Sequence, residues 1–363
     1  MTTFVQFHLL TRFGPSNPNR DDQGRPKQAV IGGGPRLRMS SQSVKRALRE
    51  SSFFELDLAG NMGTRTKRLY EKLQEKLVSG GADAKRATEI AEQVAGIFGK
   101  IEAPKKGEEA RVASTLAFIS PQEWKLAEDL AEKIAAGDDL PGDKDLKKLV
   151  LRRADGAVDI AMFGRMLASD ADFNRDAAVQ VAHAITTHTT QAEEDWFSAV
   201  DDLNKAEDTG AGHLGETAFG AGIYYQYVCV NCDLLVENLA ADRELAARGI
   251  EALARALPQT APAGKQNSFA HRPMAFYMRA EAGPRAPRDL SGAFFTPVER
   301  KLQHLGANDL ERGSILALEQ TVAQIDTCYF DGVPESHSLL NTLDGAGTLA
   351  QIVAFAGQAV RGA

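Results

Sequence analysis

The chain is poor in cysteine. Its 363 residues include three cysteines, and a small, odd number argues against a disulfide framework. Cys229 and Cys232 form a CxxC pair, but the run IYYQYVCVNCDLL around them predicts a strand, on which positions three apart point to opposite faces. A redox pair favours a helix N-terminus and a zinc site needs a second ligand pair. Since neither is evident, we expect no functional CxxC, no metal and no cofactor.

Long apolar runs are also lacking. No stretch approaches the ~18 residues that cross a bilayer, and the opening MTTFVQFHLLTRFG has no basic leader with a small-residue cleavage site. We therefore expect a cytoplasmic protein with no membrane partner. Hydrophobic residues make up 43% and charged residues 25% of the chain, as in ordinary globular proteins. The length allows one elaborated domain or two subdomains.

Positive charge is scarce overall but concentrated at one end. The net charge is −7, yet residues 1–49 carry nine Lys and Arg against two Asp, and +5 of their +7 lies in residues 36–49. The rest of the chain therefore carries −14. Positive charge concentrated in one segment of a negatively charged chain predicts a surface that binds an anion.

The order of predicted elements indicates the fold class. We expect strands at 4–11, 36–39, 158–166, 179–190, 223–235 and 268–280, helices at 41–51 and 241–258, and a helical region at 60–156. Residues 12–38 are predicted to be a long polar connection, and residues 191–222 a projecting hairpin. This order is that of a split βαββαβ sheet with helices on one face. We predict an α+β, ferredoxin-like (RRM-like) core with a helical insertion and a hairpin arm.

Residues 31–49, IGGGPRLRMSSQSVKRALR, predict a phosphate-binding surface. On a helix that starts near residue 41, Val44, Ala47 and Leu48 would face the core. Its free first-turn amides and dipole favour an anion. The basic and polar residues on the open side of this helix are Gln42, Lys45, Arg46 and Arg49. On the preceding strand, Arg36 and Arg38 would share one face. The glycines would let the backbone approach a phosphate. A solvated basic helix with a capping serine remains the plainer alternative.

Several long motifs resemble a known family. NRDD at 19–22, RLRMSSQSVKRALR, VDIAMFGRM, AHAITTHTT, DWFSAVDDL and HLGETAFGAGIYYQY occur in this order, and they are similar to the CasC-type backbone subunit of the type I-E CRISPR Cascade complex. The resemblance implies a palm (1–59, 181–190 and 223–363), helical fingers (60–180) and a thumb hairpin (191–222). It also implies a non-catalytic protein whose copies polymerise along the crRNA beside other Cascade subunits. The thumb would kink the strand and leave bases exposed to pair with target DNA.

The same resemblance implies individual RNA contacts. Residues that would hold phosphates and riboses are Asn19, Arg20, Lys27, Ser40, Gln42, Lys45, Arg46 and Arg49, and residues that would wedge against bases are Arg165, Met166, Trp196, Phe197, Ser198 and Val200. Pro35 and Ser198 depart from the family pattern, where a basic residue and a threonine are commoner. Without the resemblance, Trp196, Phe197 and Met166 would be interpreted as core residues.

A second basic cluster lies in the helical region. Lys144, Lys147, Lys148 and Arg152 follow one another at helical spacing, with Arg153 beside them. Such a cluster is usually a solvated helix face. A non-specific contact to target DNA is the alternative.

Two other functions are alternatives to a backbone subunit. A ribonuclease would use Asp21 and Asp22 or the histidines His8, His183 and His188, but no paired-carboxylate or HxxxH motif completes a site. An unrelated RRM protein would stack bases on aromatic residues of its central strands, and no such RNP motif is present.

Overall fold

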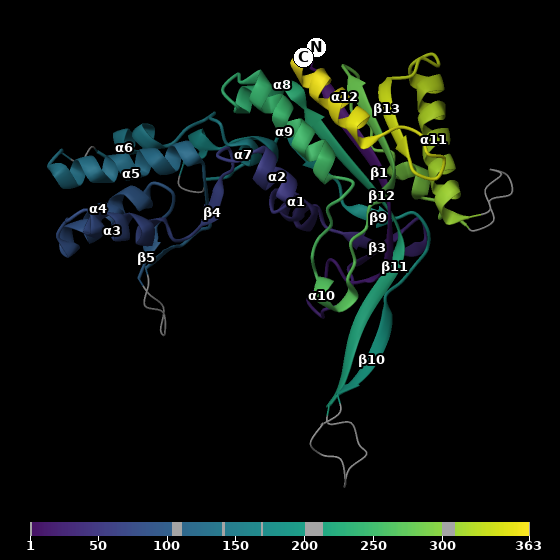
Figure 1. Ribbon diagram of the computed structural model, residues 1–363, viewed down its shortest axis with the longest axis horizontal. Helices are drawn as coiled ribbons and strands as arrows, with labels where there is room; N and C mark the ends of the chain where they lie inside the picture. The colour runs from purple at the N-terminus through teal and green to yellow at the C-terminus, as the bar shows by residue number, and fades with distance from the viewer. Residues whose placement is uncertain are drawn as a thin grey trace, which may run out of the picture. The chain divides into compact units, whose positions relative to one another are not determined.

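The computed structural model describes residues 2–103, 111–139, 142–167, 170–199, 213–299 and 309–362 (Figure 1). The chain divides into two compact units. The sheet unit comprises Met1–Phe53, Gln180–Cys229 and Ile250–Gly362, and the helical unit comprises Phe54–Val179 and Val230–Gly249. Residues 230–249, which we expected in the palm, group with the helical unit.

A nine-stranded sheet with antiparallel pairing organises the fold. Its strands, in spatial order, are β13 (Ser336–Asn341), β12 (Ala275–Gly283), β1 (Phe4–Ser16), β11 (His213–Asn231), β9 (Ala184–Thr186), β3 (Gly34–Met39) and β2 (Gln28–Ile31). Two more strands, β8 (Val179–Val181) and β10 (Glu193–Ala199), pair with β11. The predicted α+β class is confirmed, and β1 and β11 sit in the middle of the sheet.

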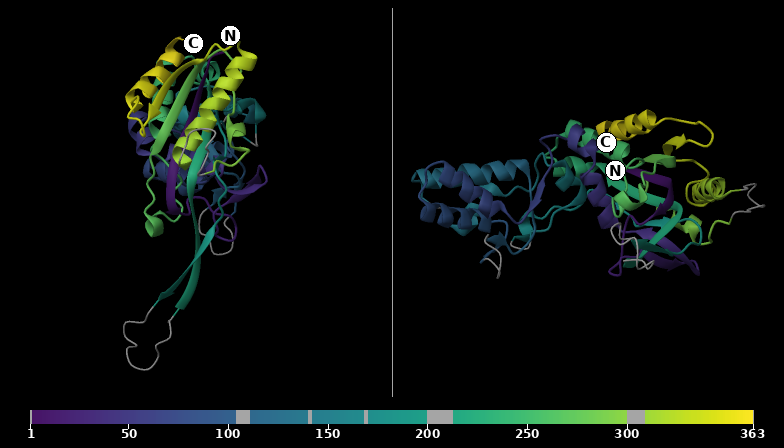
Figure 2. Two further views of the ribbon diagram at one scale, coloured as in Figure 1. Left: turned by 90° about the vertical axis from the view of Figure 1, so that its right-hand side faces the viewer. Right: turned by 60° about the horizontal axis from the view of Figure 1, so that its bottom comes forward.

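The sheet is covered on both faces, so the expectation of helices on one face is wrong. Every residue of β1 from Val5 to Leu10 is buried, although alternate side chains point to opposite faces. Helices α11 (Leu310–Tyr329) and α12 (Leu349–Gly362) pack near the β12–β13 edge (Figures 1 and 2). Glu319 of α11 accepts a hydrogen bond from the hydroxyl of Tyr277 and, at 3.0 Å, from Arg279. The chain beyond β12 therefore covers a face that a minimal split βαββαβ sheet would leave open.

A polar network is buried between β1, β11, β12 and α11. The His8 ring is fully buried, with Nδ1 3.0 Å from the Tyr225 hydroxyl and Nε2 3.8 Å from Glu281. Arg288 donates to Glu281 at 2.8 Å and to Asp326 at 2.7 Å. These charges are hydrogen-bonded to one another, as buried charges must be.

The burial of His8 makes the stability of the fold depend on pH. Burial outweighs the attraction of the Glu281 carboxylate and lowers the pKa of His8 below 6.5. As the pH falls through about 6.5, the unfolded chain takes up a proton that the folded chain refuses, so stability decreases. We expect His8→Gln to reduce the slope of unfolding free energy against pH between about pH 7 and about pH 5.5, measured by urea unfolding. The pKa values of His183 and His188 are lowered as well, so a smaller slope should remain. An identical slope in the variant and the parent would contradict this role.

The helical unit is built as the sequence predicts. Its main helices are α3 (Leu69–Ser79), α4 (Ala84–Gly96), α5 (Pro121–Ala136) and α6 (Asp143–Val150). Ser120 and Glu123 form a capping box at the start of α5, where the sequence predicted a helix start. Leu73, Ile90 and Ala127 meet in one hydrophobic cluster. Small strand pairs join the helices: β4 (Thr64–Thr66) with β7 (Ala117–Ile119), and β5 (Ile101–Glu102) with β6 (Val112–Ala113).

The strand predicted at 158–166 is wrong. Val158–Phe163 forms helix α7, and all six of its side chains are buried. A short apolar run that is buried on all sides shows neither helical nor strand periodicity, so the pattern could not separate the two. The helix ends at Gly164, whose φ of +78° is a left-handed value that glycine adopts without strain.

The CxxC pair also lies differently from the prediction. Cys229 is on β11, but Cys232 is the first residue of helix α8 (Cys232–Asn238) rather than part of a strand. Both thiols are buried and unbridged. Burial raises the pKa of Cys229 to about 11, so it is a protonated thiol near neutral pH and a poor nucleophile.

The other helices and turns of the described chain complete the fold. They are α1 (Ser41–Arg49), α2 (Ser52–Asp57), α9 (Arg243–Ala256), α10 (Gln266–Phe269) and the 3-10 turns η1 (Ala171–Phe173) and η2 (Ser291–Phe294). None of the helices in the described part of the chain is both long and apolar enough to span a bilayer.

Candidate nucleic-acid interface

The loop between β1 and β2 is held in a fixed shape by its own side chains. Asn17 donates from Nδ2 to the carbonyls of Gly24, at 2.9 Å, and Ala218, at 2.8 Å. The Asp21 carboxylate accepts the amides of Gln23 and Arg25, both at 2.9 Å. Asp21 is therefore a structural residue of this turn, and the loop leaves Arg20 exposed.

Helix α1 is tied to this loop through its first residues. The Ser40 amide donates to Asn19 Oδ1 at 2.8 Å, and the Ser40 side chain does not cap the helix. Val44 and Leu48 are buried, as predicted. No acidic residue lies in the first turn. The start of α1 thus keeps its backbone amides and positive dipole available to an anion.

The basic side chains of α1 lie on its open side. Lys45 and Arg49 are half-buried, and Gln42 and Arg46 are exposed. Arg46 forms an ion pair of 2.9 Å with Glu50, one turn later. Because both groups are exposed, this pair is weak and can be exchanged for a phosphate.

A second positive group lies at the base of the β2–β3 hairpin. The Lys27 amide donates to the Asn19 carbonyl at 3.0 Å, and the Lys27 carbonyl accepts the Arg38 amide at 2.8 Å. Arg38 lies 3.1 Å from the ring of His183. The pKa of His183 is lowered, first by burial and then by the charges of Arg38 and Lys27. The structure therefore brings Asn19, Lys27, Arg38 and Ser40 together.

The prediction that Arg36 shares the exposed face of Arg38 is wrong. Arg36 is fully buried and donates to the carbonyls of Thr186, at 3.0 Å, and Phe294, at 2.9 Å. Other parts of the chain cover both faces of this strand. The alternation of side chains along the strand therefore does not tell which of them reach solvent. Arg36 stabilises the sheet and has no surface for a phosphate.

The glycines at 32–34 serve a turn. Gly32 and Gly33 have φ of +60° and +79° between the paired residues Ile31 and Gly34, which is the pattern of a two-residue type I′ hairpin. A Cβ on Gly32 would lie 1.6 Å from the Phe295 carbonyl oxygen. The backbone at Gly32 thus lies close to the backbone of Phe295, where the sequence predicted a close approach to a phosphate.

Arg165 is buried as well, which corrects its predicted contact with RNA. Its guanidinium forms an ion pair with Glu123 and donates to the Phe118 carbonyl at 3.2 Å. A backbone bridge pairs Arg165 with Arg175, and Arg175 forms a 2.7 Å ion pair with Asp155. This buried cluster fixes the chain just before Met166.

Met166 itself projects outward, with 82% of its surface exposed. An apolar side chain this exposed is not a core residue. The predicted wedge residue is therefore available to a ligand, while its neighbour Arg165 holds the backbone.

The predicted hairpin arm is a regular two-stranded ribbon. Strand β10 pairs with the outer part of β11 from Glu193 opposite Phe219 to Ala199 opposite His213 (Figure 1). Trp196 and Phe197 are 69% and 48% exposed, which excludes their reading as core residues. Adjacent strand residues point to opposite faces of the ribbon, so Trp196 and Phe197 do not form one shared apolar face. Ser198 is exposed between them and the tip, and Val200 lies outside the described residues.

Acidic residues at the base of the arm neutralise Arg25, one of the basic residues in the segment 1–49. Arg25 forms an ion pair with Glu194 of β10 and lies 3.7 Å from Glu216 of β11. Part of the positive charge counted in residues 1–49 therefore anchors the arm to the loop.

The basic cluster of the helical region, for which DNA contact was the alternative to a solvated helix face, is largely engaged within the chain. Lys147 pairs with Asp170 at 3.4 Å, and Arg152 donates to the Lys148 and Leu149 carbonyls at the end of α6. Lys148 is exposed, and the side chain of Lys144 lies outside the described residues. These contacts fit the solvated-face reading better than a DNA site.

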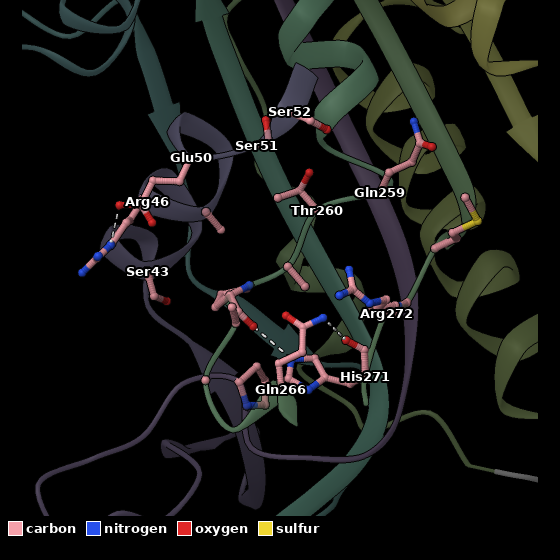
Figure 3. Close-up of a pocket in the computed structure, with 18 of the residues that line it drawn as sticks. Ser43, Arg46, Glu50, Ser51, Ser52, Gln259, Thr260, Gln266, His271 and Arg272 are labelled. Carbon is pink, nitrogen blue, oxygen red and sulfur yellow. Dashed lines mark hydrogen bonds and ion pairs between the residues drawn. The ribbon is translucent and has the colours of Figure 1, made fainter. Parts of the chain in front are cut away.

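A groove that the sequence did not predict lies beside α1. Ser43 and Arg46 line one side, and Gln259, Gln266 and Arg272 line the other (Figure 3). The only signal in the sequence was a polar stretch, QTAPAGKQNSFAHRPM, that was assigned partly to a strand.

Comparison with known proteins gives a consistent result. The profile of the CT1975-like protein family matches residues 5–356. A chain of a solved "CRISPR RNA-guided surveillance complex, pre-nicking" is 30% identical, with a TM-score of 0.83 over 98% of this chain and 100% of that one. A chain of a second "CRISPR RNA-guided surveillance complex" is 24% identical with a TM-score of 0.70 over the same shares, and this likeness concerns the fold. No curated protein matches.

Proposed function

Because the chain belongs to the CT1975-like protein family, the CasC-type backbone family of type I Cascade, we propose that it is the non-catalytic backbone subunit of a type I-E complex. Copies polymerise along the crRNA and grip its phosphates without regard to sequence. The thumb kinks the strand, and the bases between kinks pair with target DNA. The partners are the crRNA, neighbouring copies of this chain and other Cascade subunits.

One observation carries this proposal: a hydrogen bond ties the loop between β1 and β2 to the start of helix α1. The bond from Ser40 to Asn19 places an uncapped, acid-free helix start beside Arg20. Lys45 and Arg49 follow on the open side of the same helix. Backbone amides and cations of this kind bind phosphate oxygens and read no base.

The order of strands supports an RRM-like palm. Along the chain the core elements run β1, α1, β9, β11, α9 and β12, and in the sheet the four strands lie in the order β12-β1-β11-β9. This is the arrangement of a split βαββαβ unit. The thumb is β10 with the outer part of β11, and the fingers are the helical unit.

The competing functions fit less well. An RRM protein stacks bases on its open sheet face, but here α11 covers the face that holds His8, Tyr225 and Tyr277. For a ribonuclease, Asp21 is already used by the turn amides. Within the described ranges, no three His, Cys, Asp or Glu side chains are grouped to hold a metal ion.

Removal of two cations from α1 tests the phosphate assignment. We expect Lys45→Ala with Arg49→Ala to weaken binding about equally for RNAs of unrelated sequence. The slope of log affinity against log salt should fall by roughly 0.7 per lost contact. Fluorescence anisotropy with labelled single-stranded RNA at several salt concentrations measures both.

A variant with the same charge loss elsewhere serves as the control. Lys72 and Arg312 are exposed and paired with Glu75 and Asp344, and replacing both by Ala should leave the slope nearly unchanged. Equal slopes for the α1 variant and the control would count against the phosphate contacts.

A further inference from the structure

The groove beside α1 has two walls of different origin. Its volume is about 730 Å³. One wall is the side of α1 that carries Ser43, Arg46 and Glu50, and the other is residues 259–274, which connect α9 to β12 (Figure 3). Both walls belong to the sheet unit.

The second wall has a built, specific shape. The short helix α10 lies between two left-handed residues, Lys265 and Ala270, with φ of 55° and 51°. Non-glycine residues adopt this conformation at a cost and only where the surroundings impose it. The Ala270 amide donates to the Gln266 carbonyl at 2.7 Å, and Gln266 Nε2 donates to the His271 carbonyl at 3.2 Å.

This wall is also fixed against the loop after β1. A Cβ on Gly264 would lie 2.4 Å from the Pro18 carbonyl oxygen, so the two backbones touch. A second hollow of about 500 Å³, lined by Arg20 together with Asn19, Asp21 and Asp22, shares Pro18 and Gly264 with the first. The two hollows therefore adjoin at Pro18 and Gly264.

The two hollows each hold one of the predicted phosphate contacts. Arg46 lines the first hollow and Arg20 lines the second. Residues 259–274 line the first hollow and reach the second at Gly264, so a strand that occupies both hollows contacts them.

The chemistry of the second wall suits a nucleic acid. Arg272 is exposed, and it has no carboxylate partner in the part of the chain that the structure describes. Arg46 opposite is partly neutralised by Glu50. The Nε2 groups of Gln259 and Gln266 donate to the Arg255 and His271 carbonyls, which fixes both side chains. Their amide oxygens and the hydroxyl of Thr260 are neutral groups suited to riboses and base edges. His271 is 8% exposed, and its Nδ1 has no hydrogen-bond partner.

We propose that residues 259–274 form the second wall of the RNA groove, in which Arg272 contacts a phosphate and Gln259 and Gln266 contact the adjoining ribose. This inference rests on the proposed function and adds to it a surface that the basic N-terminal segment does not contain. The occupant is the single-stranded RNA itself, because the opposite wall of the groove is α1, the helix proposed to hold its phosphates.

Replacement of Arg272 tests the proposal in the full chain. We expect Arg272→Ala to weaken binding of labelled single-stranded RNA several-fold and to reduce the salt slope by roughly 0.7. Arg272→Lys should restore the slope, since it keeps the charge. RNA that contains 4-thiouridine should crosslink to the peptide 259–274, as identified by mass spectrometry. Arg312→Ala, an exposed arginine on α11 paired with Asp344, is the matched control.

The outcomes separate this inference from the function on which it rests. If the Lys45 and Arg49 variant loses affinity while Arg272→Ala does not, and no crosslink maps to 259–274, the second wall is refuted and the RNA-binding role stands. If the parent chain binds no RNA, both fail. If Arg272→Ala binds RNA normally but its copies no longer associate, the groove receives a neighbouring copy and the proposal is wrong.

Discussion

A chain with a shortened thumb should remain folded and bind RNA, but it should no longer form regular assemblies. We expect this result when residues 195–217 are replaced by an Asn-Gly turn. Trp196 and Phe197, exposed on opposite faces of the ribbon, are then lost, and with them the proposed contact between one copy and the strand held by the next. Electron microscopy of the protein with long single-stranded RNA measures the assembly.

The site of the cut follows from the hydrogen bonds at the base of the arm. Glu194 and Ala218 remain paired, and an Asn-Gly pair between them forms a two-residue hairpin. The bond from Asn17 to the Ala218 carbonyl and the ion pair between Arg25 and Glu194 are kept. The melting temperature should therefore change little.

A less drastic variant isolates the aromatic side chains. Trp196→Ala with Phe197→Ala keeps the ribbon and should weaken the regular spacing, because stacking on a base contributes about 1–3 kcal/mol per aromatic side chain. Filaments of normal regularity from the shortened chain would refute the role of the thumb.

Loss of the buried carboxylate of Glu123 should cost the helical unit about 3–5 kcal/mol of stability. Glu123 is fully buried and accepts the Arg152 amide at 2.8 Å and Arg165 Nη2 at 2.9 Å. It also lies 3.8 Å from Arg175. Alanine leaves the Arg165 guanidinium buried without a counter-charge, and such a charge is far costlier than a lost surface pair.

Glu132 on the same helix provides the control. Its ion pair with Lys76, at 2.9 Å, is 53% exposed on the Glu132 side, so Glu132→Ala should change stability by about 0–1 kcal/mol. Thermal unfolding and hydrogen exchange of the α5 amides measure the two variants. A cost for Glu123→Ala no greater than that for Glu132→Ala would contradict the importance of the buried cluster.

Local signals predicted the helices of residues 41–49 and 69–136, but not α7, α8, α11 or α12. The capping box of Ser120 and Glu123 and the regular apolar spacing of residues 69–136 depend on residues a few positions apart. The same holds for the helix of residues 41–49, where Val44 and Leu48 fix the buried side. The arm at 191–222 was found from its composition, and its pairing bears this out.

The errors occurred where burial depends on distant residues. Arg36 and Arg165 were both assigned to RNA, but each is buried against groups far away in sequence: Arg36 donates to Phe294, 258 positions on, and Arg165 pairs with Glu123, 42 positions back. The strand predicted at the α7 segment is wrong for a related reason, since an element buried on every side shows no periodicity of apolar residues.

The sequence by itself determined the α+β class, the helical insertion, the hairpin and the uneven charge, because periodicity, caps and charge are properties of neighbouring residues. Only the tertiary structure decided which cations reach solvent, because a guanidinium looks the same in sequence whether water or a distant carbonyl satisfies it. Residues 259–274 became visible as a wall of the groove only once the fold had placed them beside α1.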